Sequence, residues 1–163
     1  MTVNECHPNH ISHKIPVGIS SCLLGENVRF NGGHSRSTYC LGPLSEYFDY
    51  KQFCPEMAAG FGTPRPTMRL EGNPDQPRLV FSNKRDVVIT DQLVNSNERY
   101  LDNLPELDGY IVMKNSPSCG FERIKVYQEN GHPHMKRVRG LFTQSLIDRF
   151  PQLPIEEDGR LND

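Results

Sequence analysis

The chain has 163 residues, of which 36% are hydrophobic and 23% charged, and a formal net charge of −2 at pH 7. This length suits one domain with a core of its own. The balanced charge excludes a strong overall field for nucleic acid, because binding to phosphates needs clustered Lys and Arg. No apolar run approaches the ~18 residues that span a bilayer, and the N-terminus lacks the apolar core of a signal peptide. We therefore expect a cytoplasmic, globular protein.

The first thirteen residues predict a flexible N-terminal tail, because Pro8 and its polar neighbours give little to bury. His7, His10 and His13 recur beside Cys6, so metal capture is the alternative for this tail. Residues 14–163 are expected to form the one folded domain.

The first half of the domain predicts two strands that each end in a cysteine. "KIPVGISSC" (14–22) is β-branched and ends at Cys22, and "FDYKQFC" (48–54) ends at Cys54. Between them we expect a loop and then a helix over 37–48, which Gly42-Pro43 would break or delay. The stretch 55–70 is expected to be an irregular loop, because its prolines interrupt regular structure.

The second half alternates strand and helix patterns. "PRLVFS" and "DVVIT" predict a β-hairpin, and a helix over 90–104 follows, with Thr90 as its cap. "LDGYIVMK" (107–114) is the most strand-like run, a short strand lies within 122–134, and 140–153 is an amphipathic helix. This alternation predicts an α/β fold: a single compact Rossmann-like domain with a mostly parallel sheet and a small β-hairpin.

Three cysteines follow predicted strands, since Cys119 comes soon after the strand over 107–114. Ligands of open parallel sheets bind beyond the carboxyl ends of the strands. If the three strands are parallel neighbours, Cys22, Cys54 and Cys119 should meet at that edge. Ordinary buried cysteines are the plain alternative, because free Cys is among the most buried residue types.

The residues leave several chemistries open for such a site. A structural zinc site usually shows paired Cys-x-x-Cys or His spacings, and the sequence has none. A nucleophilic cysteine needs a histidine partner; His34 is a candidate but leaves the other two cysteines unexplained. An iron–sulfur cluster uses all three thiolates and, as a four-iron cubane, leaves one iron open for a substrate.

Three motifs in order, "GISSCLLGENVRFNGGHSR", "CPEMAAGFGTPRPTMRL" and "KNSPSCGFERIKVY", resemble the thiouracil desulfidase family from about residue 14 to the end of the chain. The resemblance implies a compact α/β fold and a 4Fe-4S cluster on Cys22, Cys54 and Cys119, with one open iron. It implies non-redox desulfuration of thiolated uracil, with release of hydrosulfide. Its expected substrates are 2-thiouracil, 4-thiouracil or 4-thiouridine, the last also within tRNA.

The same resemblance places site residues around the cluster. Glu56 is expected to relay protons, and Ser116, ahead of Ser118, to supply the catalytic serine. Cys6 and Cys40 match no ligand motif. The C-terminal "RFPQLPIEEDGRLND" is similar to the junction before a mostly helical partner domain in longer relatives, so the chain is either a stand-alone form or an excised module.

Basic residues supply the remaining expectations. Four arginines in the two cysteine-bearing loops are candidates for holding a phosphate or base, with loop-bracing salt bridges as the alternative: Arg29, Arg36, Arg65 and Arg69. A basic tract between Lys114 and Arg139 is either a solvated face or an RNA contact. An open alternative is therefore a non-catalytic metal-binding module that recognises tRNA or regulates a partner domain.

Overall fold

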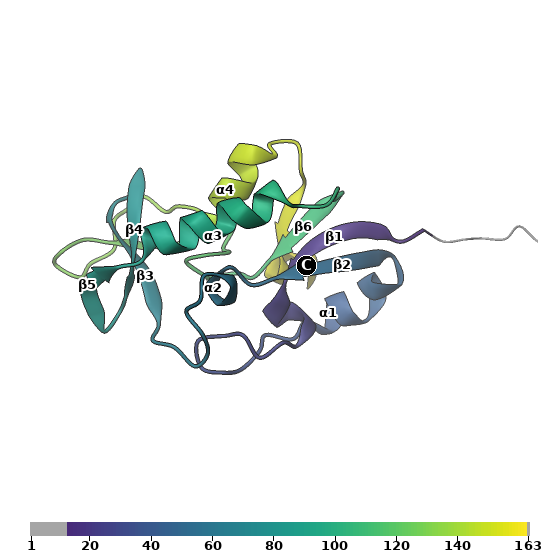
Figure 1. The fold of residues 1–163 in the computed structure, drawn as a ribbon, viewed down its shortest axis with the longest axis horizontal. Coiled ribbons are helices and arrows are strands. Elements are labelled where there is room, and N and C mark those ends of the chain that lie inside the picture. Colours follow the sequence, from purple (N-terminus) through teal and green to yellow (C-terminus); the bar gives the residue numbers. More distant parts are fainter. Residues whose placement is uncertain (1–12, 163) are drawn as a thin grey trace, which may run out of the picture.

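Two four-stranded sheets form the framework of the computed structural model, which describes residues 13–162 (Figure 1). Cys6, His7 and His10 of the predicted tail lie outside the described residues. The first sheet is parallel throughout and has the strand order β2 (Phe48–Phe53), β1 (Ile15–Ser20), β6 (Gly109–Val112) and β8 (Ile155–Glu157). Because all four strands run the same way, their carboxyl ends lie along one edge.

The second sheet is mixed and has the order β5, β4, β3, β7. β4 pairs antiparallel with both β3 and β5, whereas β3 pairs parallel with β7. The strands are β3 (Met68–Asn73), β4 (Gln76–Phe81), β5 (Lys84–Val88) and β7 (Val126–Tyr127). The α/β class and the parallel sheet are confirmed, and the predicted hairpin is β4–β5. The second sheet as a whole is not predicted from the sequence.

Helix α3 (Thr90–Asp102) joins the two sheets (Figure 1). Near its start Leu93 packs in a core cluster with residues of the second sheet, and near its end Leu101 packs with Tyr110 of β6 and Phe142 of α4 (Leu141–Arg149). All these side chains are at most 2% exposed, so the apolar Leu93, Leu101 and Phe142 each contribute roughly 1.5–3 kcal/mol by burial. One amphipathic helix thus fixes the position of both sheets.

Several predicted elements are shorter than expected or were missed. The helix over 37–48 is only α1 (Thr38–Leu41), because Gly42 adopts φ −96°, ψ −104° and Pro43 starts a separate 3-10 turn over Pro43–Glu46. The expected loop over 55–70 contains helix α2 (Pro55–Ala58) and the start of β3. Thr90 does not cap α3; its Oγ1 accepts a hydrogen bond from the Leu79 N–H of β4 instead.

The C-terminal segment supplies β8 and a 3-10 turn over Asp158–Asn162, and its similarity to a domain junction stays a prediction. The Glu157 carboxylate accepts hydrogen bonds from the backbone N–H groups of Phe121 and Glu122, and Asp158 accepts from Lys114 N–H. This segment therefore closes the parallel sheet and braces the loop that follows β6. In the described part of the chain, no helix is long and apolar enough to cross a membrane.

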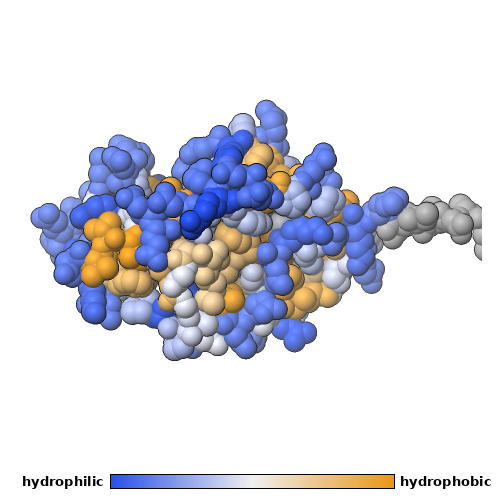
Figure 2. All heavy atoms as spheres, viewed as in Figure 1, coloured by the Kyte–Doolittle hydropathy of each residue, from blue (hydrophilic) through white to orange (hydrophobic). Residues whose placement is uncertain are grey.

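An exposed strand forms the far edge of the second sheet. Figure 2 shows an apolar patch at the left end of the molecule, where Figure 1 places β5, and Val87 and Val88 are 39% and 49% exposed. The other β5 residues, Lys84 to Asp86, are charged. Charges on an edge strand oppose pairing with another chain.

Candidate metal centre and active site

The carboxyl edge of the parallel sheet holds a cavity of about 240 Å³, and Cys22, Cys54 and Cys119 all line it. In the register of the sheet, Ser20 at the end of β1 lies beside Phe53 of β2, and β6 lies on the other side of β1. Strand pairing therefore brings together three cysteines that are 32 and 65 residues apart in sequence. All four cysteines of the described chain are free thiols.

A different local structure positions each cysteine. Cys22 lies in the 3-10 turn Ser21–Leu24, which ends at Gly25 with φ +93°, a conformation that suits glycine. Cys54 is the last extended residue before α2, and Pro55 occupies the first position of that helix, where its missing N–H costs nothing. The backbone breakers beside the cysteines thus turn the chain at the sheet edge.

The loop that carries Cys119 is held by the start of α4. The backbone N–H groups of Leu141 and Phe142 donate to the carbonyls of Pro117 and Ser118, and the Thr143 hydroxyl donates to the Cys119 carbonyl at 2.6 Å. Helix α4 therefore positions the cysteine through the loop's backbone.

Replacing Gly140 with alanine is expected to displace the loop that carries Cys119, because the new methyl group would meet the backbone of that loop. A Cβ at Gly140 would lie 2.6 Å from the Ser118 carbonyl, which is backbone and cannot swing away, although its φ of −60° suits any residue. We expect a loss of about 1–3 kcal/mol of stability and weaker metal loading, measured by thermal unfolding and metal analysis. Gly109→Ala is the control, because its Cβ would lie 3.5 Å from the nearest atom. Equal stability and equal metal content in the two variants would contradict tight packing at Gly140.

The three thiols share one electrostatic environment. Burial raises the pKa of Cys22 from 9.0 to about 11, raises that of Cys54, and raises that of Cys119 well above its usual range. The charge of Cys54 adds to the rise at Cys22 and at Cys119. Three thiolates so placed need a strong positive charge between them, which a metal supplies.

This donor set fits a cluster better than one ion. Within residues 13–162, no three His, Cys, Asp or Glu side chains lie close enough together to hold a single metal ion. Zinc–sulfur bonds are about 2.3 Å, so three ligands of one zinc lie within roughly 4 Å of one another. A cubane instead binds each thiolate at a different iron, which suits thiols spread around a cavity wall.

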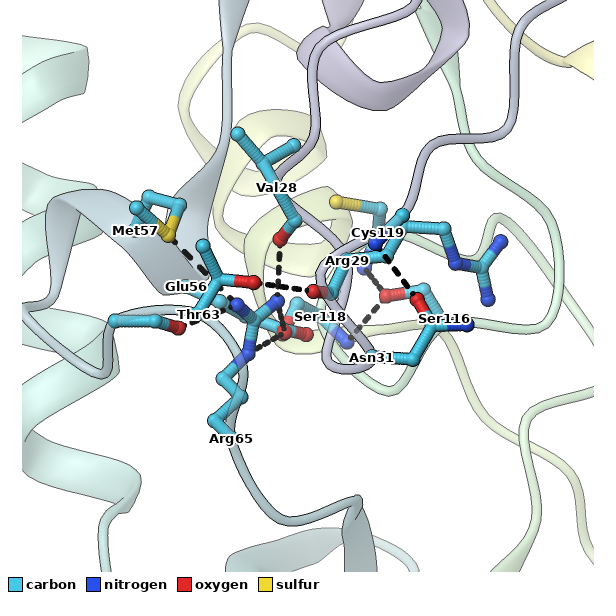
Figure 3. Close-up of polar contacts among 12 residues, drawn as sticks. Val28, Arg29, Asn31, Glu56, Met57, Thr63, Arg65, Ser116, Ser118 and Cys119 are labelled. Carbon is cyan, nitrogen blue, oxygen red and sulfur yellow. Dashed lines mark hydrogen bonds and ion pairs between the residues drawn. The ribbon is translucent and has the colours of Figure 1, made fainter.

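Glu56 sits between two buried partners at the cavity wall (Figure 3). One carboxylate oxygen, Oε2, accepts from Nε of Arg65 at 2.8 Å and also from Nη2. The other, Oε1, accepts from the Ser118 hydroxyl at 2.8 Å. Since Ser118 is fully buried and the Arg65 side chain is 3% exposed, the carboxylate is held in one orientation.

Arg65 has no donor left for a ligand. Besides Glu56, its guanidinium donates to the carbonyls of Gly62 and Val28 and to the sulfur of Met57, so all five N–H groups have protein partners. From the sequence, either substrate binding or loop bracing is expected for this arginine. Its contacts agree with the loop-bracing alternative, because they tie α2 to the loops before and after it.

The other predicted side chains divide into those in the cavity wall and those outside it. Arg29 and Ser116 line the cavity, and the Ser116 oxygen accepts from the backbone N–H groups of Ser118 and Cys119. Arg36 is exposed outside this wall, and Arg69 lines a neighbouring cavity. The catalytic and binding roles proposed for these residues stay predictions.

His34 does not support the cysteine-nucleophile alternative. The ring is exposed outside the cavity wall, and its Nδ1 accepts from the backbone N–H of Arg36.

The apolar part of the wall is not predicted from the sequence. It is formed by four large side chains: Phe30, Phe53, Met68 and Met113. The ring of Phe53 is itself fixed by stacking on Tyr100, with centroids 3.6 Å apart. Their large apolar side chains are the only signal that the sequence gives for these four residues, and it does not distinguish core from pocket. Apolar walls with a few polar groups are typical of small-molecule sites.

The structure is an α/β protein with three cysteines in the wall of a cavity at the carboxyl edge of its parallel sheet. The chain belongs to the 2-thiouracil desulfurase family, whose model matches residues 17–158. It is thus an enzyme of a thiouracil desulfidase family.

Two similar proteins support this assignment. A Bacillus subtilis (strain 168) relative, uncharacterized protein YbbK, is 30% identical over 157 residues, which cover 89% of this chain and 97% of YbbK. The solved structure of the [4Fe-4S]-dependent thiouracil desulfidase TudS matches with a TM-score of 0.61 at 25% identity, over 91% of this chain and 94% of that one.

Proposed function

We propose that this chain removes sulfur from thiolated uracil by hydrolysis, with a [4Fe-4S] cluster held by Cys22, Cys54 and Cys119. The observation that carries the proposal is the wall of one cavity formed by three free thiols, with the Glu56 carboxylate beside them. The family and the cofactor of TudS agree with it.

The cluster, when bound, supplies an iron without a protein ligand, a soft Lewis acid for a thiocarbonyl sulfur. The apolar side chains of the wall hold the pyrimidine ring and exclude bulk water. Overall, one water is consumed, its oxygen replaces sulfur on the ring carbon, and hydrosulfide and a proton leave. No electrons are transferred.

Glu56 takes the proton of the attacking water in this proposal, and its Oε1 is the oxygen available for that role. Arg65 occupies Oε2 with two donors, whereas Oε1 receives one hydrogen bond, from Ser118. A carboxylate oxygen has capacity for a second partner. Arg29, which lines the cavity, is the candidate to hold a pyrimidine oxygen, and Ser116 shapes the loop around Cys119.

Purification without oxygen is expected to give a brown protein with about four irons per chain. Sulfide release from 2-thiouracil, 4-thiouracil, 4-thiouridine and thiolated tRNA, assayed side by side, identifies the substrate. A brown protein that releases no sulfide from any of these would favour the non-catalytic metal-binding module. Zinc alone in the anaerobic protein would contradict the proposed cofactor.

A further inference from the structure

Ser20 is a buried hydroxyl at the carboxyl end of β1, and the proposed function gives it no role. Its side chain is 3% exposed and lines the same cavity as the three cysteines. Strand β1 lies between β2 and β6 in the parallel sheet. The Ser20 hydroxyl therefore lies between the strand that leads to Cys54 and the strand that leads to Cys119.

The oxygen of Ser20 has a partner, but its hydrogen does not. The oxygen accepts a hydrogen bond from the backbone N–H of Met113 at 3.0 Å. Met113 directly follows β6, so this bond ties the ends of β1 and β6 together. A hydroxyl also carries one hydrogen to donate, and no oxygen or nitrogen atom of residues 13–162 accepts it.

The sulfur of Cys119 is an acceptor within reach of this hydrogen. Burial, followed by the negative charges nearby, raises the pKa of the Cys119 thiol, whereas hydrogen bonding from the Ser20 side chain lowers it. A donor of this kind favours the ionised thiolate, which is the form that binds a metal. Cys119 is only 6% exposed, so water has little access to its sulfur in place of Ser20.

The other two cysteines depend on donors of the main chain. Burial raises the pKa of Cys22 and of Cys54, and backbone N–H groups oppose that rise: the N–H of Cys22 itself at Cys22, and those of Met57 and Glu56 at Cys54. Alanine substitution leaves backbone N–H groups in place. The Ser20 hydroxyl is thus the one of these donors that an alanine variant removes.

We propose that the Ser20 hydroxyl donates a hydrogen bond to the Cys119 thiolate when the cluster is bound, and so makes the open iron a stronger Lewis acid. This inference rests on the proposed function, because it takes Cys119 as a cluster ligand. Hydrogen bonds to the sulfurs are among the features that set the reduction potential of an iron–sulfur cluster. A donor stabilises negative charge on the sulfur, so it makes the cluster easier to reduce. Ser20 is a positioning residue that acts through Cys119.

Magnetic resonance of the reduced cluster tests the contact directly. The protein is prepared without oxygen and reduced with dithionite, and electron–nuclear double resonance compares samples in H2O and in D2O. We expect the parent to show a signal from an exchangeable proton coupled to the cluster. Ser20→Thr, which retains a hydroxyl, should keep this signal, and Ser20→Ala should lose it.

The reduction potential measures the electronic effect of the same hydrogen bond. We expect Ser20→Ala to retain its iron and to shift the midpoint potential to a more negative value. Ser21→Ala is the matched control, because Ser21 is the next residue, is 7% exposed and lines the same cavity. Its hydroxyl is not among the main groups that shift the pKa of the three cysteines, so the potential of this variant should equal that of the parent.

A purely structural role for Ser20 predicts a different result. Ser20→Ala leaves the Met113 N–H without its acceptor, so a lower melting temperature is expected under either role. Comparing Ser20→Thr with Ser20→Val repeats the test with two side chains of equal size, of which only threonine has a hydroxyl. Equal potentials in both pairs of variants, or a parent without a proton signal that depends on Ser20, would overturn the inference.

Kinetics distinguish this inference from the proposed function. At equal iron content, kcat/KM for the substrate that the parent desulfurates should fall about tenfold in Ser20→Ala, as for other residues that hydrogen-bond to metal ligands. An unchanged kcat/KM would refute the effect on the open iron. A Ser20-dependent proton signal and potential in a protein that releases no sulfide would keep the hydrogen bond and refute the proposed function. Sulfide release with the same potential in every variant would do the reverse.

Discussion

Replacing Cys22, Cys54 or Cys119 with alanine, one at a time, is expected to abolish both iron binding and sulfide release. Each variant leaves only two of the three proposed thiol ligands. Without the metal the remaining thiols stay protonated near neutral pH, because burial raises the pKa of each. Mutating residues that only hydrogen-bond to metal ligands usually lowers metal affinity or activity roughly 10–100-fold. Loss of a ligand itself should lower both by more than that. Iron per chain, visible absorbance and sulfide release after anaerobic preparation measure it.

Cys40→Ala is the matched control, because Cys40 is also a buried free thiol. It lies in α1, packs in a core cluster with Val17 and Ile19, and is absent from the cavity wall. We expect this variant to keep iron and turnover. Metal-free forms of all four variants should unfold close to the metal-free parent, which separates a lost ligand from a lost fold. Full turnover in the Cys119 variant would refute the ligand set.

Glu56→Gln is expected to keep the cluster and to lower kcat by about 10²–10⁴-fold, the usual contribution of a positioned general base. The amide retains the size of the side chain but cannot take a proton from water. The change also leaves the buried Arg65 guanidinium without its counter-charge, at a cost of up to roughly 3–5 kcal/mol. Iron content, steady-state kinetics and chemical denaturation therefore need to be measured together.

Ser118→Ala is the companion to this variant. It removes one donor from Oε1 of Glu56 and leaves the ion pair with Arg65 intact. A net contribution of about 1 kcal/mol per hydrogen bond predicts a fall in kcat of about tenfold or less. Normal turnover in the Glu56→Gln variant would show that Glu56 is not the base. Loss of iron from this variant would show that the Glu56 carboxylate holds the fold around the metal.

Most regular elements could be predicted because their signals are local. The β-branched run of β1, the run over 107–114 and the apolar spacing of α3 each carry their period within a short window. Strand β8 was missed because it has three residues, none fully buried. Strand β3 was missed because two nearby prolines, Pro64 and Pro66, suggested irregular structure. Whether such a short segment becomes a strand depends on pairing with a neighbouring strand, and the local sequence pattern does not show that pairing.

The sequence by itself determined that three cysteines end or follow strands, which was enough to place them at one edge once the strands were taken as parallel. Only the tertiary structure decided the roles of the polar residues around them. Four arginines lie near the cysteine motifs in the sequence, yet only Arg65 reaches Glu56. Ser118 rather than Ser116 contacts that carboxylate, across 62 residues of chain. Side chains alternate along a strand because of local backbone geometry, so a short stretch of sequence predicts them. The contacts of Arg65 and Ser118 depend instead on the paths of distant loops and on packing against α4, which a short stretch of sequence does not contain.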